Sequence, residues 1–450
     1  MSSLLIKNGT IVTMNKNRDI FKGDILINDN EIIDVKSKID TEADQIIDAK
    51  GKVVIPGLIQ THVHLTQTLF RGQADDLELL DWLKERVWPL EATHTEESNY
   101  ISAKLGIAEM IKGGTTSIID METVNHTDAA INATYETGIR ALTGKCMMDY
   151  GDGVPDGLME DIEESIKESV KLLKKWHGKG NGRIQYAFAP RFAVSCSEEL
   201  LTRVRDLARE YNVIIHTHAS ENREEVQVIQ EERGMRNLKY LHKIGLTGKN
   251  LVLAHCIWLD DEEMRILADT GTSVAHCPSS NLKLASGIAK IPEMLDMGVN
   301  VSIGADGAPC NNNMDMFTEM RIAALIQKGR LLKPTVMPAE KVFELATLGG
   351  AKAMGMEDRL GSIERGKLAD IVIMNLNNLH NSPSKEVNIV SQLVYSAKAQ
   401  DVETTIIDGK VVMLEGELTT INEDLLIDDV NRVIKKQVES AGIKRTLIAR

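Results

Sequence analysis

Histidines occur in pairs at two places where a predicted strand ends. The first pair is His62 and His64, and the second is His216 and His218, with Glu221 shortly after it. Residues i and i+2 of a strand point to the same face, so each pair directs two imidazoles to one side of its strand. A single His-x-His is common by chance, and it indicates a metal site only where further ligands converge on it.

Two more predicted strand ends carry such ligands, His255 and Asp306. Together the four strand ends offer three imidazoles and one carboxylate to a divalent ion, and they leave a carboxylic acid and another imidazole free. Zinc accepts nitrogen and oxygen ligands, and a catalytic ion keeps an open position for water. The sequence therefore predicts a catalytic metal site with proton-transfer groups beside it.

The remaining seven histidines have three expected placements. His216 shares the face of His218, so the two could exchange roles, although we expect His216 to support the site rather than bind the ion. His276 ends the seventh predicted strand and is either structural or part of the pocket. The histidines that we expect to be exposed to solvent are His94, His126, His177, His242 and His380.

The middle of the chain alternates strand-like and helical patterns. The eight strand-like runs cover residues 60–64, 117–121, 140–144, 183–189, 213–218, 250–255, 272–276 and 300–306. Eight such repeats are typical of an α/β fold, the (β/α)8 TIM barrel, in which catalytic groups lie at the C-terminal ends of the strands. A doubly wound open sheet is the alternative, but no Gly-x-Gly-x-x-Gly turn follows a strand.

Both ends of the chain are rich in short strand-like segments separated by turn residues. We predict that residues 1–57 and 362–420 form one small β-sandwich domain, that residues 58–361 form the barrel, and that residues 421–450 form a helical tail. Within the second segment we expect strands at residues 370–374, 393–396 and 404–414.

Composition excludes several classes of function. The 450 residues carry a net charge of −14, which disfavours binding to nucleic acid or to anionic membranes. The five cysteines are widely spaced without a Cys-x-x-Cys pair, so neither a disulfide framework nor a thiolate zinc site is indicated. With no apolar stretch typical of a signal peptide or membrane helix, we expect a cytoplasmic protein.

Several motifs resemble those of the amidohydrolase superfamily. Residues 56–64 (PGLIQTHVH) are similar to its first-strand motif, and residues 254–256, 275–281 and 304–307 are similar to later ones. Residues 361–370 resemble the segment in which the chain re-enters the small β-domain. The resemblance covers essentially the whole chain and implies a metal-dependent hydrolase.

Within this superfamily the chain resembles the mononuclear deaminase branch, which includes guanine deaminase, methylthioadenosine/S-adenosylhomocysteine deaminase and the triazine hydrolases. Binuclear members carry a carboxylated lysine at the end of strand four, and residues 184–191 contain no lysine. The resemblance implies one ion, zinc or alternatively iron(II). It implies metal ligands at His62, His64, His218 and Asp306, and catalytic roles for Glu221, His255 and Asp306.

The substrate signals conflict. Gln67, Arg191 and Phe192 match positions that contact the base in guanine deaminase, and an arginine fork suits a ring carbonyl. Arg191 could instead close a salt bridge at the barrel rim. We include His276 among the candidate pocket residues. These residues favour conversion of guanine to xanthine and ammonia as the first hypothesis.

Residues 69–76 and 88–91 resemble the methylthioadenosine/S-adenosylhomocysteine deaminases instead, in which the glutamate matching Glu91 binds ribose hydroxyls. Those enzymes usually have histidine at the position of Arg191. An adenosine-derivative deaminase is therefore the alternative, and an s-triazine amino- or chlorohydrolase is a third. A non-enzymatic assembly protein is disfavoured because the ligand set has no gap. We expect a small-molecule partner, and a homo-oligomer because relatives of this fold often form one.

Overall fold

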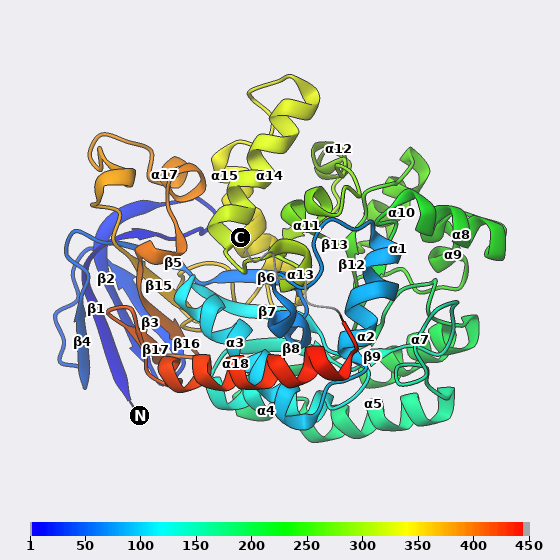
Figure 1. Ribbon diagram of the computed structural model, residues 1–450. Coiled ribbons are helices and arrows are strands. Elements are labelled where there is room, and N and C mark those ends of the chain that lie inside the picture. The colour runs from blue at the N-terminus through cyan, green and yellow to red at the C-terminus, as the bar shows by residue number, and fades with distance from the viewer. Residues whose placement is uncertain (1, 444–450) are drawn as a thin grey trace, which may run out of the picture.

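Two sheets organise the chain, a parallel barrel from its middle and a second sheet from its two ends (Figure 1). The structure is a computed structural model and describes residues 2–443. Among these residues no helix combines the length and the apolar character that crossing a membrane requires.

The barrel consists of eight parallel strands, each within a few residues of its predicted position. In spatial order they are β6 (Leu58–Val63), β7 (Thr115–Met121), β8 (Arg140–Gly144), β10 (Ile184–Pro190), β11 (Ile214–Ala219), β12 (Leu251–His255), β13 (Ser273–His276) and β14 (Val301–Ile303). The short β9 (Cys146–Met147) pairs with β10. Beyond β14 the Asp306 amide donates to the His62 carbonyl at 3.0 Å, which brings the last strand beside the first. The predicted (β/α)8 barrel is confirmed.

Helices surround the barrel and begin at capping side chains. The Ser197 hydroxyl accepts from the Leu200 amide, and the Asp260 carboxylate accepts from the Glu263 amide. The surrounding helices are α3 (Glu96–Lys112), α4 (Thr127–Thr137), α5 (Ile162–Trp176), α6 (Lys179–Gly182), α7 (Glu198–Tyr211), α8 (Arg223–Arg233), α9 (Asn237–Lys243), α10 (Asp261–Thr270), α12 (Ile291–Asp296), α14 (Met316–Leu331), α15 (Ala339–Glu344), η3 (Leu345–Gly349) and α16 (Gly350–Ala353).

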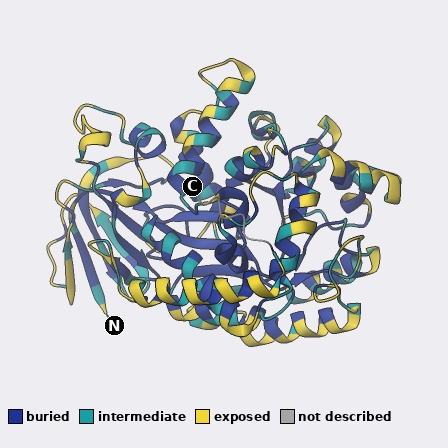
Figure 2. Ribbon diagram, viewed as in Figure 1, coloured by how far each residue is buried: buried dark blue, intermediate teal, exposed yellow. Residues whose placement is uncertain are grey.

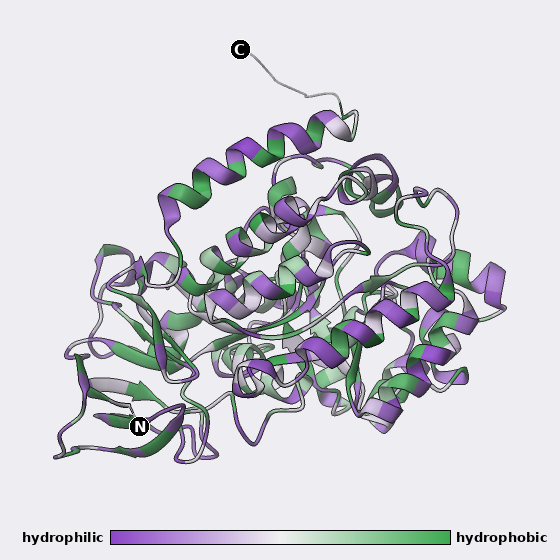
Figure 3. Cartoon of the chain, turned by 90° about the horizontal axis from the view of Figure 1, so that it is seen from below, coloured by the Kyte–Doolittle hydropathy of each residue, from purple (hydrophilic) through white to green (hydrophobic). Residues whose placement is uncertain are grey.

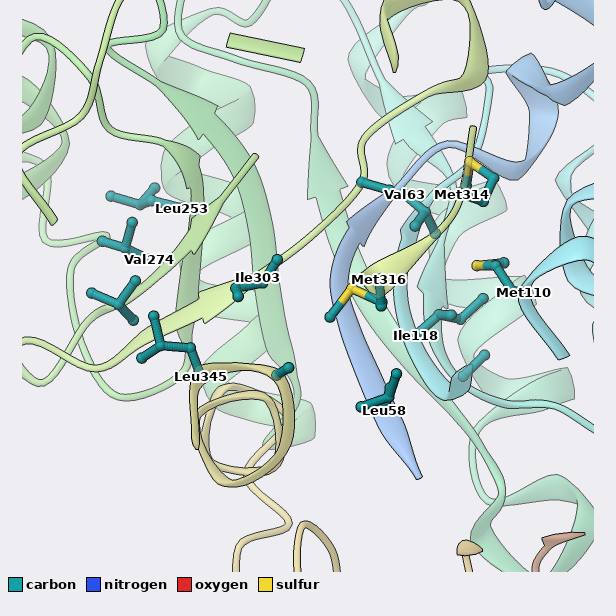
Figure 4. Packing of buried hydrophobic residues seen from close by; sticks show 14 of the residues in the cluster. Leu58, Val63, Met110, Ile118, Leu253, Val274, Ile303, Met314, Met316 and Leu345 are labelled. Atoms are coloured by element: carbon teal, nitrogen blue, oxygen red, sulfur yellow. The ribbon is translucent and has the colours of Figure 1, made fainter. Parts of the chain in front are cut away.

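The main hydrophobic core lies between the barrel strands and these helices. Leu253, Val274 and Ile303, from three adjacent strands, pack near Leu345 of η3 (Figure 4). The strands are buried along almost their whole length, whereas the helices carry an exposed outer face (Figure 2). Burial on both faces is characteristic of parallel strands that helices cover. This core fixes the strand ends that carry the polar residues.

Short helical turns lie in the loops at the C-terminal mouth of the barrel. They are η1 (Leu65–Phe70), α1 (Leu79–Trp82), the π-helical turn η2 (Leu83–Val87), α2 (Trp88–Glu91), α11 (Pro278–Lys283) and α13 (Ala308–Asn311). Because loops after the strands line the mouth of such a barrel, these turns surround the predicted site.

The second sheet combines both ends of the chain, as expected for the small β-domain. Its strands are β1 (Ser3–Val12), β2 (Ile20–Asn28), β3 (Glu31–Lys36), β4 (Gln45–Asp48), β5 (Val53–Pro56), β15 (Ile371–Met374), β16 (Val402–Ile407), β17 (Lys410–Leu414) and β18 (Glu417–Leu418). The ends meet where β5 pairs with β15 in antiparallel register. The proposed boundaries between the barrel and the small domain, at residues 57 and 361, place the paired strands β5 and β15 together in the small domain. We retain these boundaries as a proposal.

One predicted strand is wrong. Residues 393–396 lie in and just after the helix α17 (Ile389–Tyr395), between the turns η4 (Leu379–Asn381) and η5 (Ala399–Asp401). The Asn388 side chain caps this helix by accepting from the Ser391 amide at 3.0 Å. Val390, Leu393 and Val394 are buried at helical spacing. With so few apolar residues, the sequence pattern did not distinguish the helical period of about 3.6 residues from the alternation of a strand.

The predicted helical tail contains α18 (Glu423–Ser440), and residues 444–450 lie outside the described residues. Hydrophilic and hydrophobic residues alternate along this helix (Figure 3). Leu426 and Val433 are buried in a cluster with Ile101 of α3. The apolar side of the helix therefore covers α3.

A buried ion cluster connects the barrel to the small domain. The Arg140 guanidinium at the start of β8 donates from Nε to Asp370 at 2.8 Å, and from Nη2 to Asp408 at 3.1 Å. All three side chains are buried. Burial alone would lower the pKa of Arg140, but the two carboxylates raise it.

We expect Arg140→Met to destabilise the protein by about 3–5 kcal/mol, because it leaves two buried carboxylates without their cation. Urea unfolding measures the change in the free energy of unfolding. Arg432→Met is the control, since its pair with Glu97 is exposed and its loss should change the free energy of unfolding little. Equal losses from the two substitutions would contradict this role for Arg140.

Candidate metal centre and active site

The four predicted metal ligands converge at the mouth of the barrel. His62 and His64 come from the end of β6, His218 from β11, and Asp306 from the loop after β14. Their ligand atoms all lie within 4.8 Å of one another, and all four side chains are buried. His62 Nε2 is 3.2 Å and His64 Nε2 is 3.4 Å from Asp306 Oδ1. Three imidazoles and a carboxylate in this arrangement suit a divalent ion.

The imidazoles present their Nε2 atoms to the centre because their Nδ1 atoms are occupied. His64 Nδ1 is 2.9 Å from the Met121 carbonyl, and His218 Nδ1 is 2.7 Å from the Arg191 carbonyl. A carbonyl only accepts, so each Nδ1 carries the proton and each Nε2 lone pair is free. Burial lowers the pKa of His64 to about 3, which keeps the ring neutral. A neutral imidazole is the form that binds a metal.

The cluster also contains polar atoms that a cation would satisfy. His62 Nε2 is buried and has no hydrogen-bond partner among the described residues. Asp306 is also buried, and the imidazoles of His62 and His64 beside it are neutral because burial lowers their pKa to about 4 and about 3. An ionised carboxylate buried among neutral imidazoles requires a compensating positive charge. The residues present therefore fit one divalent ion.

Glu221 and His255, the two predicted proton-transfer groups, lie beside this centre. His255 Nε2 is 3.5 Å from Glu221 Oε2 and 3.8 Å from Asp306 Oδ2. Burial raises the pKa of Glu221 well above its usual range, and the charges of Asp306 and Glu225 add to this effect. This environment favours the protonated form of Glu221, the form that can donate a proton.

Sequence reasoning assigned no role to two side chains that orient these groups. On α11, the Ser280 hydroxyl donates to Asp306 Oδ2 at 2.6 Å, and Asn281 Oδ1 lies 2.8 Å from His255 Nδ1. Both residues fall within the motif at 275–281, which was the available signal. His255 and Asp306 have φ of 70° and 65°, a strained conformation for residues other than glycine. Such strain is often found at functional sites.

A pocket opens onto the centre beneath α1 and η2. Its lining residues are His64, Gln67, Leu79, Trp82, Leu83, Arg191, Phe192, His218, Glu221, His255, Leu284 and Asp306. The cavity has a volume of about 20 Å³. That is little more than the space one water needs, so side chains or the segment at 79–91 must move aside before a purine ring enters.

Three of the predicted substrate contacts come together, but they bind one another. Arg191 donates to the two oxygens of Glu91 at 2.6 and 3.3 Å. Gln67 Nε2 donates to Glu91 Oε1 at 2.8 Å. All three side chains are buried. The Phe192 ring lines the pocket near His218, with their centroids 6.3 Å apart.

Two other histidines are placed away from the pocket. His276 is buried and does not line the pocket, and neither of its ring nitrogens has a hydrogen-bond partner among the described residues. His94 is also buried, so the expectation that it is exposed was wrong. Its ring joins the start of α3 to η1, because Nδ1 lies 2.9 Å from the Ser98 hydroxyl and Nε2 lies 2.9 Å from the Thr66 carbonyl.

Comparison with known proteins agrees with this geometry. Residues 53–412 match the amidohydrolase family. The chain belongs to the amidohydrolase family. It is accordingly a hydrolase that acts on carbon–nitrogen bonds.

Relatives of this amidohydrolase are deaminases. It is 44% identical over 416 residues to the 5-methylthioadenosine/S-adenosylhomocysteine deaminase of Thermococcus onnurineus, covering 92% of this chain and 95% of that one. It is 43% identical over 410 residues to the 5′-deoxyadenosine deaminase of Methanothermobacter thermautotrophicus, covering 91% and 93%.

Solved structures of deaminases share the whole fold. An adenosine deaminase from Xanthomonas campestris with bound zinc matches with a TM-score of 0.91 and 32% identity, over 98% of this chain and 99% of that one. The guanine deaminase of E. coli matches with a TM-score of 0.82 and 28% identity, over 92% and 100%.

Below the site, Glu319 of α14 connects the loops that follow β13 and β14. Its Oε2 accepts from the Ser279 amide at 3.2 Å, and its Oε1 accepts from Asn311 Nδ2 at 2.8 Å. Asn311 also donates to the Ala305 carbonyl beside Asp306. Burial raises the pKa of Glu319 to about 7.

This shift predicts a pH-dependent stability. Between pH 4.5, the usual pKa, and about 7, the folded state keeps a proton that the unfolded chain has lost, so stability falls as pH rises. The wild type should lose about 3 kcal/mol relative to Glu319→Gln across this window. Urea unfolding of both proteins at several pH values measures it. Glu210→Gln, at an exposed position, should follow the wild-type profile, and a constant difference between wild type and Glu319→Gln would refute the shift.

Proposed function

We propose that this amidohydrolase deaminates the adenine ring of a 5′-substituted adenosine, such as 5′-methylthioadenosine or 5′-deoxyadenosine, and releases ammonia. The carrying observation is the buried cluster of three imidazoles and Asp306, with the buried Glu221 beside it, in a chain that resembles such deaminases. The comparisons favour this substrate over guanine, which the sequence analysis placed first.

The pocket also argues against guanine as the first choice. The case for guanine required the Arg191 guanidinium to bind a ring carbonyl. The guanidinium instead forms a salt bridge with Glu91. A salt bridge was the alternative role that the sequence analysis gave to Arg191. A buried guanidinium that already has a carboxylate partner loses a strong interaction if it turns to a neutral carbonyl.

The lining further favours an uncharged 5′ substituent. The described lining residues include one arginine, Arg191, and no lysine. Arg191 is already paired with Glu91. Leu79, Trp82, Leu83 and Leu284 make the rest of the wall largely apolar. Placing an amino-acid tail against such a wall leaves its charges unpaired, which is costly. A methylthio or methyl group fits this wall better than a homocysteine tail.

The reaction uses the residues at the centre in distinct roles. His62, His64, His218 and Asp306 would hold a divalent ion, for which we propose zinc, and when bound it would supply a water of lowered pKa as the nucleophile. Glu221 donates its proton to the ring nitrogen next to the amino-bearing carbon. His255 Nε2, which has no hydrogen-bond partner among the described residues, accepts the proton from the attacking water. Asn281 fixes the ring of His255. His255 then gives its proton to the amine as the carbon–nitrogen bond breaks, and the hydroxyl proton on the ring carbon returns to Glu221, which leaves a ring carbonyl and ammonia.

The role of Glu221 can be tested by substitution. Glu221→Gln should bind one equivalent of metal as the wild type does, but its kcat should fall by about 10²–10⁴-fold because the amide cannot act as the acid. Metal analysis and ammonia release measure the two properties. Glu224→Gln, at an exposed position three residues later, should retain wild-type activity. Near-native turnover by Glu221→Gln would remove Glu221 from the mechanism.

A substrate panel tests the proposed function. We expect kcat/KM for 5′-methylthioadenosine and 5′-deoxyadenosine to exceed that for S-adenosylhomocysteine by at least about tenfold, which corresponds to about 1.4 kcal/mol of transition-state binding. Guanine should be a poor substrate. Ammonia release measures each rate. Turnover of guanine but of no adenosine derivative would overturn the proposal.

A further inference from the structure

His216 lies directly behind the metal ligand His62. His216 Nε2 is 2.7 Å from His62 Nδ1, and His216 Nδ1 is 3.1 Å from the Val252 carbonyl of the neighbouring strand. Both rings are completely buried, and they meet edge to face with their centroids 4.9 Å apart. Both nitrogens of His216 therefore have partners, so this side chain is not itself a metal ligand.

The hydrogen bonds fix which nitrogen of each ring carries a proton. The Val252 carbonyl only accepts, so His216 donates from Nδ1 and its Nε2 is unprotonated. That Nε2 must then accept from His62 Nδ1. With its proton on Nδ1, His62 has a free lone pair on Nε2, the atom that lies 3.2 Å from Asp306 Oδ1. The Val252 carbonyl thus determines, through His216, the tautomer in which His62 faces the centre.

His62 differs in this respect from the other two ligand histidines. His64 and His218 are oriented by the main-chain carbonyls of Met121 and Arg191, which no substitution removes. His62 is oriented by a side chain. Of the three histidines, His62 is therefore the one whose ring orientation can be lost through a substitution at another residue.

We propose that His216 is a positioning residue for the metal centre, which holds His62 in the ring orientation and tautomer that binds the ion. Without an acceptor behind it, His62 can rotate or place its proton on Nε2, and the site loses a preorganised ligand. The expected consequence is weaker metal binding, independent of any substrate.

The test compares two substitutions at this position by metal affinity. His216→Leu removes the acceptor, whereas His216→Gln can place an amide oxygen near the former Nε2. We expect the dissociation constant for zinc, measured by competition with a chromophoric chelator, to rise about 10–100-fold in His216→Leu. In His216→Gln it should stay within about threefold of the wild type, since an acceptor remains. The absorption spectrum of the cobalt(II)-loaded protein should change in the leucine variant only.

His94→Leu is the matched control, because His94 is another buried histidine with both ring nitrogens occupied, and it lies outside the metal cluster. It should lower the unfolding temperature and leave zinc affinity unchanged. If His216→Leu does not fold, His216→Asn replaces it, since its shorter side chain does not reach His62. Wild-type affinity and an unchanged cobalt spectrum in the leucine or asparagine variant would overturn the proposal. An equal loss in His216→Gln and His216→Leu would also overturn it. Because no substrate is used, this outcome is independent of the proposed deaminase activity.

Discussion

The structure depends on the burial of one carboxylate and three neutral imidazoles close together at the mouth of the barrel. A buried charge on Asp306 is costly unless a positive charge compensates it, and the buried His62 Nε2 has no hydrogen-bond partner among the described residues. A cation meets both requirements together. The barrel provides the remaining condition, because its hydrogen-bonded strands bring residues 62 and 306 to the same place. Fold and chemistry therefore constrain each other at this point.

Most of the barrel, and the convergence of the candidate metal ligands, could be predicted from the sequence for one physical reason. Buried parallel strands are continuous apolar runs, and a polar residue such as His64, His218 or Asp306 at the end of such a run stands out. The helix α17 was missed because its few apolar residues fit a strand as well as a helix. His94 was missed because burial by a neighbouring turn leaves no pattern near the residue itself.

The substrate pocket was harder to predict because its decisive contact is not local. Arg191 and Glu91 are 100 residues apart, and each by itself suggests a different substrate. The two residues come together only in the folded chain. Once paired with Glu91, the guanidinium is no longer free to bind a ring carbonyl. Ser280 and Asn281 show the same limit, since their partners depend on how α11 sits beside strands β12 and β14. Residue type identifies ligands more readily than it identifies the groups that orient them.

Arg191 contributes to the site through both its side chain and its main chain. Its side chain faces Glu91 in the pocket, while its main-chain carbonyl accepts from His218. The carbonyl is present whichever amino acid occupies this position. Selection, or an engineer, can therefore exchange the pocket-facing group without removing the anchor of a metal ligand. A replacement at this position therefore changes the wall of the pocket while the hydrogen bond that orients His218 can remain.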